Sequence, residues 1–504
     1  MQEILSQIFT LDHLLMMNLG IAAGILIGAM PGLNITFAVT ILLTFTYKMD
    51  ALTAMYLLLG AYCGGMYGGS ITAILINTPG TVNAVCTSFD GYPLAQRGRG
   101  ADAMKAALWG SSFGGVFSAI VLLVLAPKLA KMLLYIGSPE YFALCVFGIL
   151  AAVSVECRSL DGLIKGVLSA VLGLVFSCVG ADPVFGTNRF VFGNTNMLAG
   201  IKIVSAMLGA YAVCQVMINC RAVYVHGDEE LKVPEYKKGT FGLKDFASHW
   251  LTIIKSAIIG TFIGAVPGCG GETSAMLAYN EQKRISKNPE QMGKGAMEGV
   301  IAAEVANNAT TGGAMIPMLT LSVPGDGVMA ILLSALMMQG ISPGVNLFSE
   351  GNFWVYAVMG GLLIINIFMF MQGSAFTKLF AQVSRIPQSL MMPCIILMCV
   401  IGSYAINNNI FECMVMVAFG IIGFFLRSFD FPVAPMCISL VLGKLCEANL
   451  RRSMILSKGS WSVFVTRPIS CIILLLAVAV VVFPLINKHR ADKKAAESAE
   501  STAE

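Results

Sequence analysis

Apolar residues form long runs along this chain, and these runs set the first expectation for its fold. Runs wide enough to cross a membrane lie near residues 12–30, 104–126, 141–155, 162–180, 198–218, 251–267, 353–371, 390–406, 411–426 and 468–487. A helix needs roughly 20 apolar residues to cross a bilayer fully. The pattern therefore predicts an all-α integral membrane protein with about 10–14 membrane-embedded helices.

One apolar run occurs twice with nearly the same letters. Residues 24–32 read GILIGAMPG and residues 260–268 read GTFIGAVPG, so six of nine positions are identical at an offset of 236. The glycines recur every four residues, which puts them on one helix face where another backbone can approach closely. Both copies then break at Pro-Gly, which indicates an internal repeat with interrupted helices.

A second pair of similar segments follows in the same order. Residues 68–80 read GGSITAILINTPG and residues 312–325 read GGAMIPMLTLSVPG. Each has a double glycine, a short apolar stretch and a Pro-Gly. We expect these stretches to be too short to span comfortably and to form discontinuous or re-entrant helices. The sequence leaves open whether the two repeats are inverted or parallel.

The repeats suggest a division of the chain into two halves. We expect a first transmembrane repeat over 1–220, a polar linker over 221–245 and a second repeat over 246–487. Residues 488–504, which read KHRADKKAAESAESTAE, have the composition of a solvated, disordered tail.

Composition and charge agree with a membrane protein and exclude several functions. The chain is 57% hydrophobic and 12% charged, with a mean hydropathy of +0.78, whereas soluble domains carry about 25% charged residues. Its net charge of +4 is scattered, so nucleic-acid binding is not expected. The basic tail favours a cytoplasmic C-terminus, and the loops near 97–105, 281–294 and 451–458 are further cytoplasmic candidates. The cysteines and histidines show no metal-binding spacing, so we expect no metal beyond a Na⁺ ion and no cofactor.

The four Pro-Gly breaks carry the functional prediction. In secondary transporters, interrupted segments in corresponding positions mark the substrate site, with half-helix N-termini facing anionic groups and loosened carbonyls facing the coupling ion. A single Pro-Gly is more often a kink, but the repetition favours a site. Apart from Lys48, no Lys or Arg lies within 24–96 or 295–344. A bound anion would therefore need a co-transported cation, Na⁺ or H⁺.

These considerations give two sets of candidate residues. The expected substrate-binding residues surround the second pair of segments: Gly68, Gly69, Ser70, Asn77, Thr78, Pro79, Gly80, Asn307, Asn308, Gly313, Pro324 and Gly325. The ion-coupling candidates are Gly32, Asn34, Gly268, Gly270, Glu304 and Thr310. Glu304 is the candidate for proton coupling because it lies in an otherwise apolar segment. The same sequence context also fits a carboxylate at a helix end near the membrane interface.

Several motifs resemble those of a known family. GILIGAMPGLN, YGGSITAILINTPG followed by DGYPLAQRG, GAVPGCGGETSAMLAYNEQKRISKNPEQMGKG and AEVANNATTGGAMIPMLTLSVPG are similar to signatures of the large membrane subunit of the tripartite tricarboxylate transporters. The resemblance runs from about residue 18 to 480. It implies a bacterial inner-membrane symporter that imports di- or tricarboxylates together with a small membrane subunit and a periplasmic solute-binding protein. Ala303, Ser322 and Asp326 depart from the family pattern, and the extra carboxylate of Asp326 puts citrate itself in doubt.

Other functional classes stay open at this point. The alternatives are a stand-alone organic anion carrier, a channel, or a membrane-embedded enzyme. The sequence has no H-E-x-x-H and no G-x-x-x-x-G-K-[ST] motif, so catalysis and a built-in ATPase are not expected. Flux that saturates and runs uphill with an ion gradient would separate a carrier from a channel.

Overall fold

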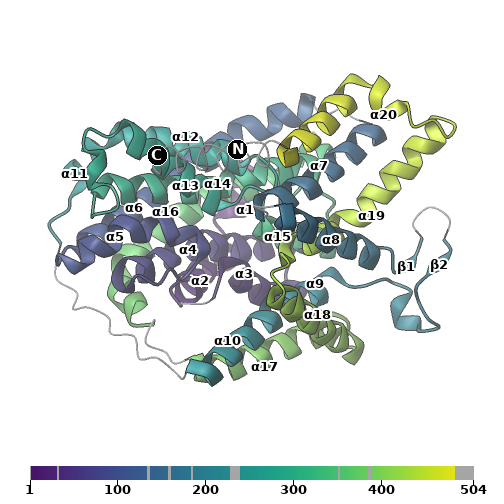
Figure 1. Cartoon of the computed structure of the whole chain (residues 1–504), viewed down its shortest axis with the longest axis horizontal. Helices are drawn as coiled ribbons and strands as arrows, with labels where there is room; N and C mark the ends of the chain where they lie inside the picture. The colour runs from purple at the N-terminus through teal and green to yellow at the C-terminus, as the bar shows by residue number, and fades with distance from the viewer. Residues whose placement is uncertain are drawn as a thin grey trace, which may run out of the picture. The chain divides into compact units, whose positions relative to one another are not determined.

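The protein is almost entirely helical in a computed structural model (Figure 1). The structure describes residues 2–30, 33–132, 137–156, 160–182, 186–226, 239–349, 352–383 and 388–482. The tail 488–504, residues 227–238 of the predicted linker and the ion candidate Gly32 lie outside these residues. Within them the only sheet is the antiparallel pair β1 (Gly180–Ala181) and β2 (Asn188–Arg189). Eight described helices are long and apolar enough to cross a membrane and six more are shorter, which confirms an all-α membrane protein.

The helices fall into two compact units. Unit 1 comprises residues 1–134 and 204–424, and unit 2 comprises 135–203 and 425–504. Each unit contains residues from both halves of the sequence. The boundaries 1–220 and 246–487 therefore do not correspond to the two compact units, and they stay a prediction about the sequence repeat. The helices of unit 1 are α1 (Gln2–Ile8), α2 (Leu11–Gly28), α3 (Ile35–Leu43), η1 (Thr44–Lys48), α4 (Ala51–Ile76), η2 (Val82–Ala84), α5 (Val85–Gln96), α6 (Gly100–Met132), α9 (Ile203–Met207), the π-helix η5 (Leu208–Val213), α10 (Cys214–His226), α11 (Leu243–Ser248), α12 (Trp250–Gly264), α13 (Gly271–Ile285), η6 (Pro289–Gln291), α14 (Met297–Leu321), α15 (Gly327–Met338), η7 (Val345–Phe348), α16 (Phe353–Val383), α17 (Gln388–Asn407) and α18 (Ile410–Ser428).

The two central helices of unit 1 are longer than the sequence suggested. α4 has 26 residues and α14 has 25, and the double glycines lie inside them, so the expectation that these segments are too short to span was wrong. Both helices end at a left-handed residue, Asn77 with φ 54° and Ser322 with φ 59°. Such a residue closes a helix C-terminus and reverses the chain. The helix breaks therefore fall at the Pro-Gly segments, as predicted.

Glycines let each central helix pack tightly against the helix that starts its repeat. A Cβ on Gly28 of α2 would stand 2.7 Å from the carbonyl oxygen of Gly65 in α4. In the second repeat a Cβ on Gly264 of α12 would stand 2.7 Å from the carbonyl oxygen of Thr310 in α14. Only glycine permits such close contact between backbones. In lipid no hydrophobic effect drives helices together, so this close packing stabilises their association. The repeat seen in the sequence is therefore also a repeat of packing.

The contacts between α4 and α14 show that the repeats are inverted. Ser70 donates a hydrogen bond to Glu304 at 2.5 Å, and four residues earlier in α4 the carbonyl oxygen of Met66 accepts one from Asn307 at 3.3 Å. As the residue number of the contact falls in α4, it rises in α14, so the two helices run antiparallel. Because they are equivalent helices of the two repeats, one repeat is upside down relative to the other, as in many transporters.

After each central helix the chain turns back toward the middle of unit 1. The N–H of Gly80 donates to the carbonyl oxygen of Gly69 at 3.2 Å, and Asn83 reaches the sulfur of Met66 at 3.0 Å. α5 then runs outward again, because a Cβ on Gly100, just beyond it, would lie 3.6 Å from the side chain of Leu75 near the end of α4. The re-entrant segment is therefore 77–96, which overlaps only the end of the stretch expected to form it, 68–80. Its counterpart in the second repeat is 322–338.

A buried aspartate ties the first re-entrant segment to the second repeat. Asp90 of α5 accepts hydrogen bonds from the backbone N–H groups of Gly293, Gly295 and Ala296 at 2.7–2.8 Å and from the hydroxyl of Tyr279 at 2.8 Å. It is fully buried. The loops near 97–105 and 281–294, both predicted to be cytoplasmic, consequently lie at the same end of α4, as the positive-inside rule expects.

Unit 2 packs two parallel helix pairs. It contains α7 (Ser138–Glu156), α8 (Leu160–Ser177), η4 (Thr195–Met197), α19 (Val433–Leu456), α20 (Val463–Thr466), a helix over Pro468–Val482 and the strands β1 and β2. α8 runs parallel to α19, since Ser169 meets Pro432 and a Cβ on Gly443 would meet Ser177. α7 runs parallel to the last helix, since Pro139 meets Ser470 and Ser154 meets Val480.

The packing of unit 2 corrects one topology expectation. The start of α7 lies by the 457–467 loop, since Glu140 pairs with Arg467 at 2.6 Å, whereas the end of α7 lies by the end of the last helix. The 451–458 loop and residue 482 are thus at opposite ends of unit 2. Both were expected on the cytoplasmic side, and at most one of them can be there.

Candidate functional site

Four helices begin close together where α4 and α14 cross. A Cβ on Gly271, the first residue of α13, would stand 2.6 Å from the amide nitrogen of Asn83 in η2, which leads into α5. A Cβ on Gly270 would stand 3.7 Å from the Cβ of Asp326, the residue before α15. A Cβ on Gly327 would stand 3.9 Å from the hydroxyl oxygen of Thr36 in α3. The N-termini of α3, α5, α13 and α15 therefore form one continuous group. We call this place the crossing region and define it by Tyr62, Met66, Asn83, Asn307 and Asp326.

The four N-termini differ in how their free N–H groups are satisfied. Asn34 caps α3 by accepting from the N–H of Phe37 at 2.7 Å, and Asp326 caps α15 by accepting from that of Met329 at 2.8 Å. No side chain caps α5 or α13. An uncapped helix N-terminus carries a partial positive charge and donors that suit an anion. The α5 and α13 side of the crossing region is therefore the side suited to a carboxylate.

Two buried oxygen atoms on that side have no hydrogen-bond partner among the described residues. They are Oδ1 of Asn307 and Oγ1 of Thr81, which belong to side chains 0% and 3% exposed. A Cβ on Gly271 would stand 2.5 Å from this Asn307 oxygen. Buried polar atoms normally have partners, so unpartnered ones facing uncapped helix ends indicate a place for a polar ligand.

The other side of the crossing region is acidic. Tyr62 donates a hydrogen bond to Asp326 at 2.6 Å, which joins α4 of the first repeat to the second re-entrant segment. A carboxylate here repels an anion at the α3 and α15 ends. The inverted repeats therefore present chemically different surfaces, and the departure from the family pattern at Asp326 lies directly at the candidate site.

The structure separates the predicted substrate residues by their surroundings. Gly69 and Gly80 are hydrogen-bonded to each other next to Thr81, and Asn307 lies in the crossing region. Gly68 and Gly313 face the backbones of α2 and α12, where they serve helix packing. The remaining residues lie elsewhere: Ser70 contacts Glu304, Asn308 faces Met369 of α16, Asn77 is exposed at the end of α4, Thr78 and Pro79 follow it, and Pro324 and Gly325 are buried beside Gly268.

The predicted ion-coupling residues also fall into separate places. Gly268 donates its N–H to the carbonyl oxygen of Gly325 at 2.7 Å, so it holds the second break together. Thr310 is hydrogen-bonded to Ser274 at 2.5 Å, inside the α13–α14 contact. Asn34 and Gly270 lie in the N-terminal group described above. Glu304 is fully buried in α14, so the alternative of an interfacial helix-end carboxylate is wrong.

Sequence reasoning missed several residues of the crossing region. Thr81 and Asn83 follow Pro79-Gly80 directly, so extending the motif by three residues would have included them. Tyr62 could have been found from the repeat, because the 245 residues that separate Gly80 from Gly325 also separate Tyr62 from Asn307.

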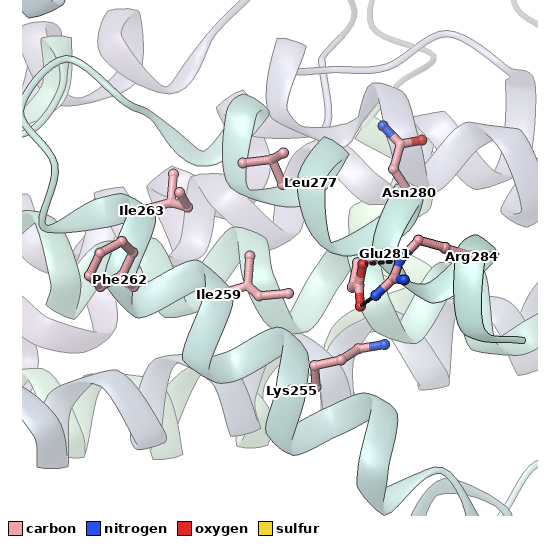
Figure 2. A pocket seen from close by; sticks show the side chains of 8 residues that line it. All are labelled: Lys255, Ile259, Phe262, Ile263, Leu277, Asn280, Glu281 and Arg284. Atoms are coloured by element: carbon pink, nitrogen blue, oxygen red, sulfur yellow. Dashed lines mark hydrogen bonds and ion pairs between the residues drawn. The ribbon is translucent and has the colours of Figure 1, made fainter. Parts of the chain in front are cut away.

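An open groove lies apart from the crossing region, between α12 and α13 (Figure 2). Its volume is about 520 Å³. Figure 2 shows the apolar Phe262, Ile263 and Leu277 toward one end and the charged Lys255, Glu281 and Arg284 toward the other. Phe262 is 70% exposed, as expected for a side chain that faces lipid. None of the break residues lines this groove.

Comparison with known proteins agrees with the motifs. Residues 14–438 match the family described as "Tripartite tricarboxylate transporter TctA family". An Agrobacterium vitis protein, "Uncharacterized 52.8 kDa protein in TAR-I ttuC' 3'region", is 35% identical over 474 residues, covering 94% of this chain and 93% of that one. A second, "Uncharacterized protein in TAR-II ttuC' 3'region" of the same species, is 35% identical over 46% of this chain and 97% of its own length. No solved structure matches the chain.

Proposed function

Because this chain belongs to the tripartite tricarboxylate transporter TctA family, we propose that it is the large translocating subunit of a secondary transporter for small di- or tricarboxylate anions. The observation that carries the proposal is the group of four helix N-termini at the crossing of two inverted repeats. In this proposal the carboxylate lies against the uncapped ends of α5 and α13, near Thr81, Asn83 and Asn307. Backbone N–H groups and amide donors hold it, since 49–96 and 295–344 contain no Lys or Arg and the basic residues of α13, Lys283 and Arg284, lie in its last turn.

The same charge inventory supports cation symport. A multiply charged anion held only by dipoles and neutral donors is under-compensated in a membrane interior, and a co-transported Na⁺ or H⁺ supplies the missing charge. Family membership supports the remaining parts of the system: a small membrane subunit, a periplasmic solute-binding protein and a location in the bacterial inner membrane.

The proposal is tested by uptake into liposomes. The chain is reconstituted with the small membrane subunit, and entry of a labelled dicarboxylate and a labelled tricarboxylate is measured with and without the binding protein. We expect saturable uptake that exceeds equilibrium under an inward Na⁺ or H⁺ gradient and requires the binding protein. Equal, non-saturating entry in all conditions would instead favour a channel, and full uptake by the chain alone would favour a stand-alone carrier.

A further inference from the structure

The carboxylate of Glu304 is bound by side-chain hydroxyl groups. Its Oε1 accepts hydrogen bonds from Ser70 of α4 at 2.5 Å and from Thr87 of α5, and its Oε2 accepts one from Ser111 of α6 at 2.7 Å. All four side chains are buried, and Glu304 is 0% exposed. Hydroxyl groups from three helices therefore meet at a carboxylate of a fourth helix, and we call this group of four side chains the Glu304 pocket.

No positive side chain of the described residues is paired with this carboxylate. Hydrogen bonds from three hydroxyl groups and burial act on Glu304. Cys86 of α5 interacts electrostatically with Glu304 and with Glu272 of α13, and neither of these two residues supplies a positive charge. An unpaired carboxylate buried inside a membrane protein is costly, and such residues are retained where they bind or carry a cation.

We propose that the Glu304 pocket binds the coupling cation of the transport cycle, a single H⁺ or Na⁺. Hydroxyl groups suit either ion, because each can rotate to present a lone pair instead of a proton. A proton would reside on Glu304 and be donated to one of the three hydroxyl oxygens. A Na⁺ ion would take the carboxylate and hydroxyl oxygens as hard ligands. The inference rests on the proposed transport function and adds the position of the ion.

The pocket is coupled to the crossing region through the elements that form both. Glu304 lies one helical turn from Asn307 in α14, and Thr87 of α5 lies four residues after Asn83 of η2, which leads into α5. Ser70 similarly lies one turn from Met66 in α4. A cation bound by side chains of α4, α5 and α14 holds the uncapped N-terminus of α5 beside Asn307. Binding of the cation therefore pre-organises the anion site, which is positive cooperativity between the two ligands.

The test measures uphill transport in a variant that lacks the Glu304 charge. Glu304→Gln keeps the shape of the side chain but removes its charge. In reconstituted liposomes we expect this variant to lose gradient-driven accumulation by about a hundredfold, because the coupling cation no longer binds and no longer pre-organises the anion site. Glu412→Gln is the matched control, since Glu412 is also buried in unit 1 and accepts a hydrogen bond from Ser205 at 2.7 Å. Gradients of Na⁺ at equal pH, and of pH at equal Na⁺, identify the ion.

Binding of the ion is measured independently on purified protein without carboxylate. The midpoint of thermal unfolding should rise with NaCl relative to choline chloride, or with falling pH, in wild type and Glu412→Gln but not in Glu304→Gln. Ser111→Ala, which removes one ligand and keeps the charge, should need about tenfold more cation for the same effect. Uphill uptake or cation-dependent stabilisation that persists in Glu304→Gln would overturn the proposal. Wild type that is stabilised by the cation yet moves no carboxylate would overturn the proposed function instead.

Discussion

Asp90→Ala is expected to leave almost no folded protein in the membrane. The substitution removes one acceptor group and leaves two buried donors, the N–H of Ala296 and the Tyr279 hydroxyl, without a partner, together with the partly buried N–H groups of Gly293 and Gly295. Each unsatisfied buried donor costs about 1–3 kcal/mol, so the free energy of unfolding should fall by about 4 kcal/mol or more. The measurement is the yield and thermal midpoint of detergent-extracted protein on size exclusion.

Two variants show whether the hydrogen bonds of Asp90 are responsible. Tyr279→Phe removes one of the four donors and should cost about 1 kcal/mol. Asp161→Ala, at a carboxylate whose side chain is 76% exposed and paired with Lys165, should change stability by less than about 1 kcal/mol. An Asp90→Ala protein as stable as Asp161→Ala would show that this cluster does not hold the re-entrant segment.

Gly80→Val is expected to abolish carboxylate uptake. A Cβ at this position would overlap the carbonyl oxygen of Gly28, a backbone atom that cannot move aside without separating α2 from α4. Overpacking of this kind costs about 1–3 kcal/mol and displaces the re-entrant segment that carries Thr81 and Asn83. Uptake of labelled carboxylate is measured on protein that inserts and elutes as wild type does.

The inverted repeat supplies a graded comparison for this prediction. At the equivalent Gly325, a Cβ would stand 2.7 Å from the Cβ of Ala314, so Gly325→Ala should impair uptake less than Gly80→Ala does. Gly242→Ala is the control, because its Cβ would come no closer than 3.8 Å to Asp245. Wild-type uptake by Gly80→Val would mean that the segment after α4 is not packed against α2.

The sequence was sufficient to predict the class of protein and the positions of the helix breaks. Long apolar runs, recurring glycines and Pro-Gly pairs are local signals, and the breaks at Pro79-Gly80, Pro267-Gly268 and Pro324-Gly325 coincide with helix ends, whereas Pro31-Gly32 lies outside the described residues. The full lengths of α4 and α14 were missed, because both helices are rich in glycine and in polar residues such as Asn307 and Glu304. Such residues lower the local hydropathy although they are buried against protein rather than exposed to lipid.

The composition of the candidate site was harder to predict for a physical reason. Ser70, Thr87 and Ser111 are common residues in three separate segments, and only tertiary folding brings their hydroxyl groups to Glu304. The relative direction of the repeats is likewise a property of packing between α4 and α14. A repeated motif reads the same in either orientation, so only the cross-contacts of Ser70 and Met66 show the inversion.

The central claim is that a carboxylate binds at the crossing of the inverted repeats, and affinity measured on single-residue variants tests it most directly. Equilibrium binding of a labelled carboxylate to purified Asn83→Ala and Asn307→Ala protein should weaken by about tenfold to a hundredfold, because each loses a buried polar contact. Asn449→Ala, at a buried asparagine of unit 2, should bind as wild type does. Wild-type affinity in folded Asn83→Ala and Asn307→Ala protein would contradict the account and move the site elsewhere.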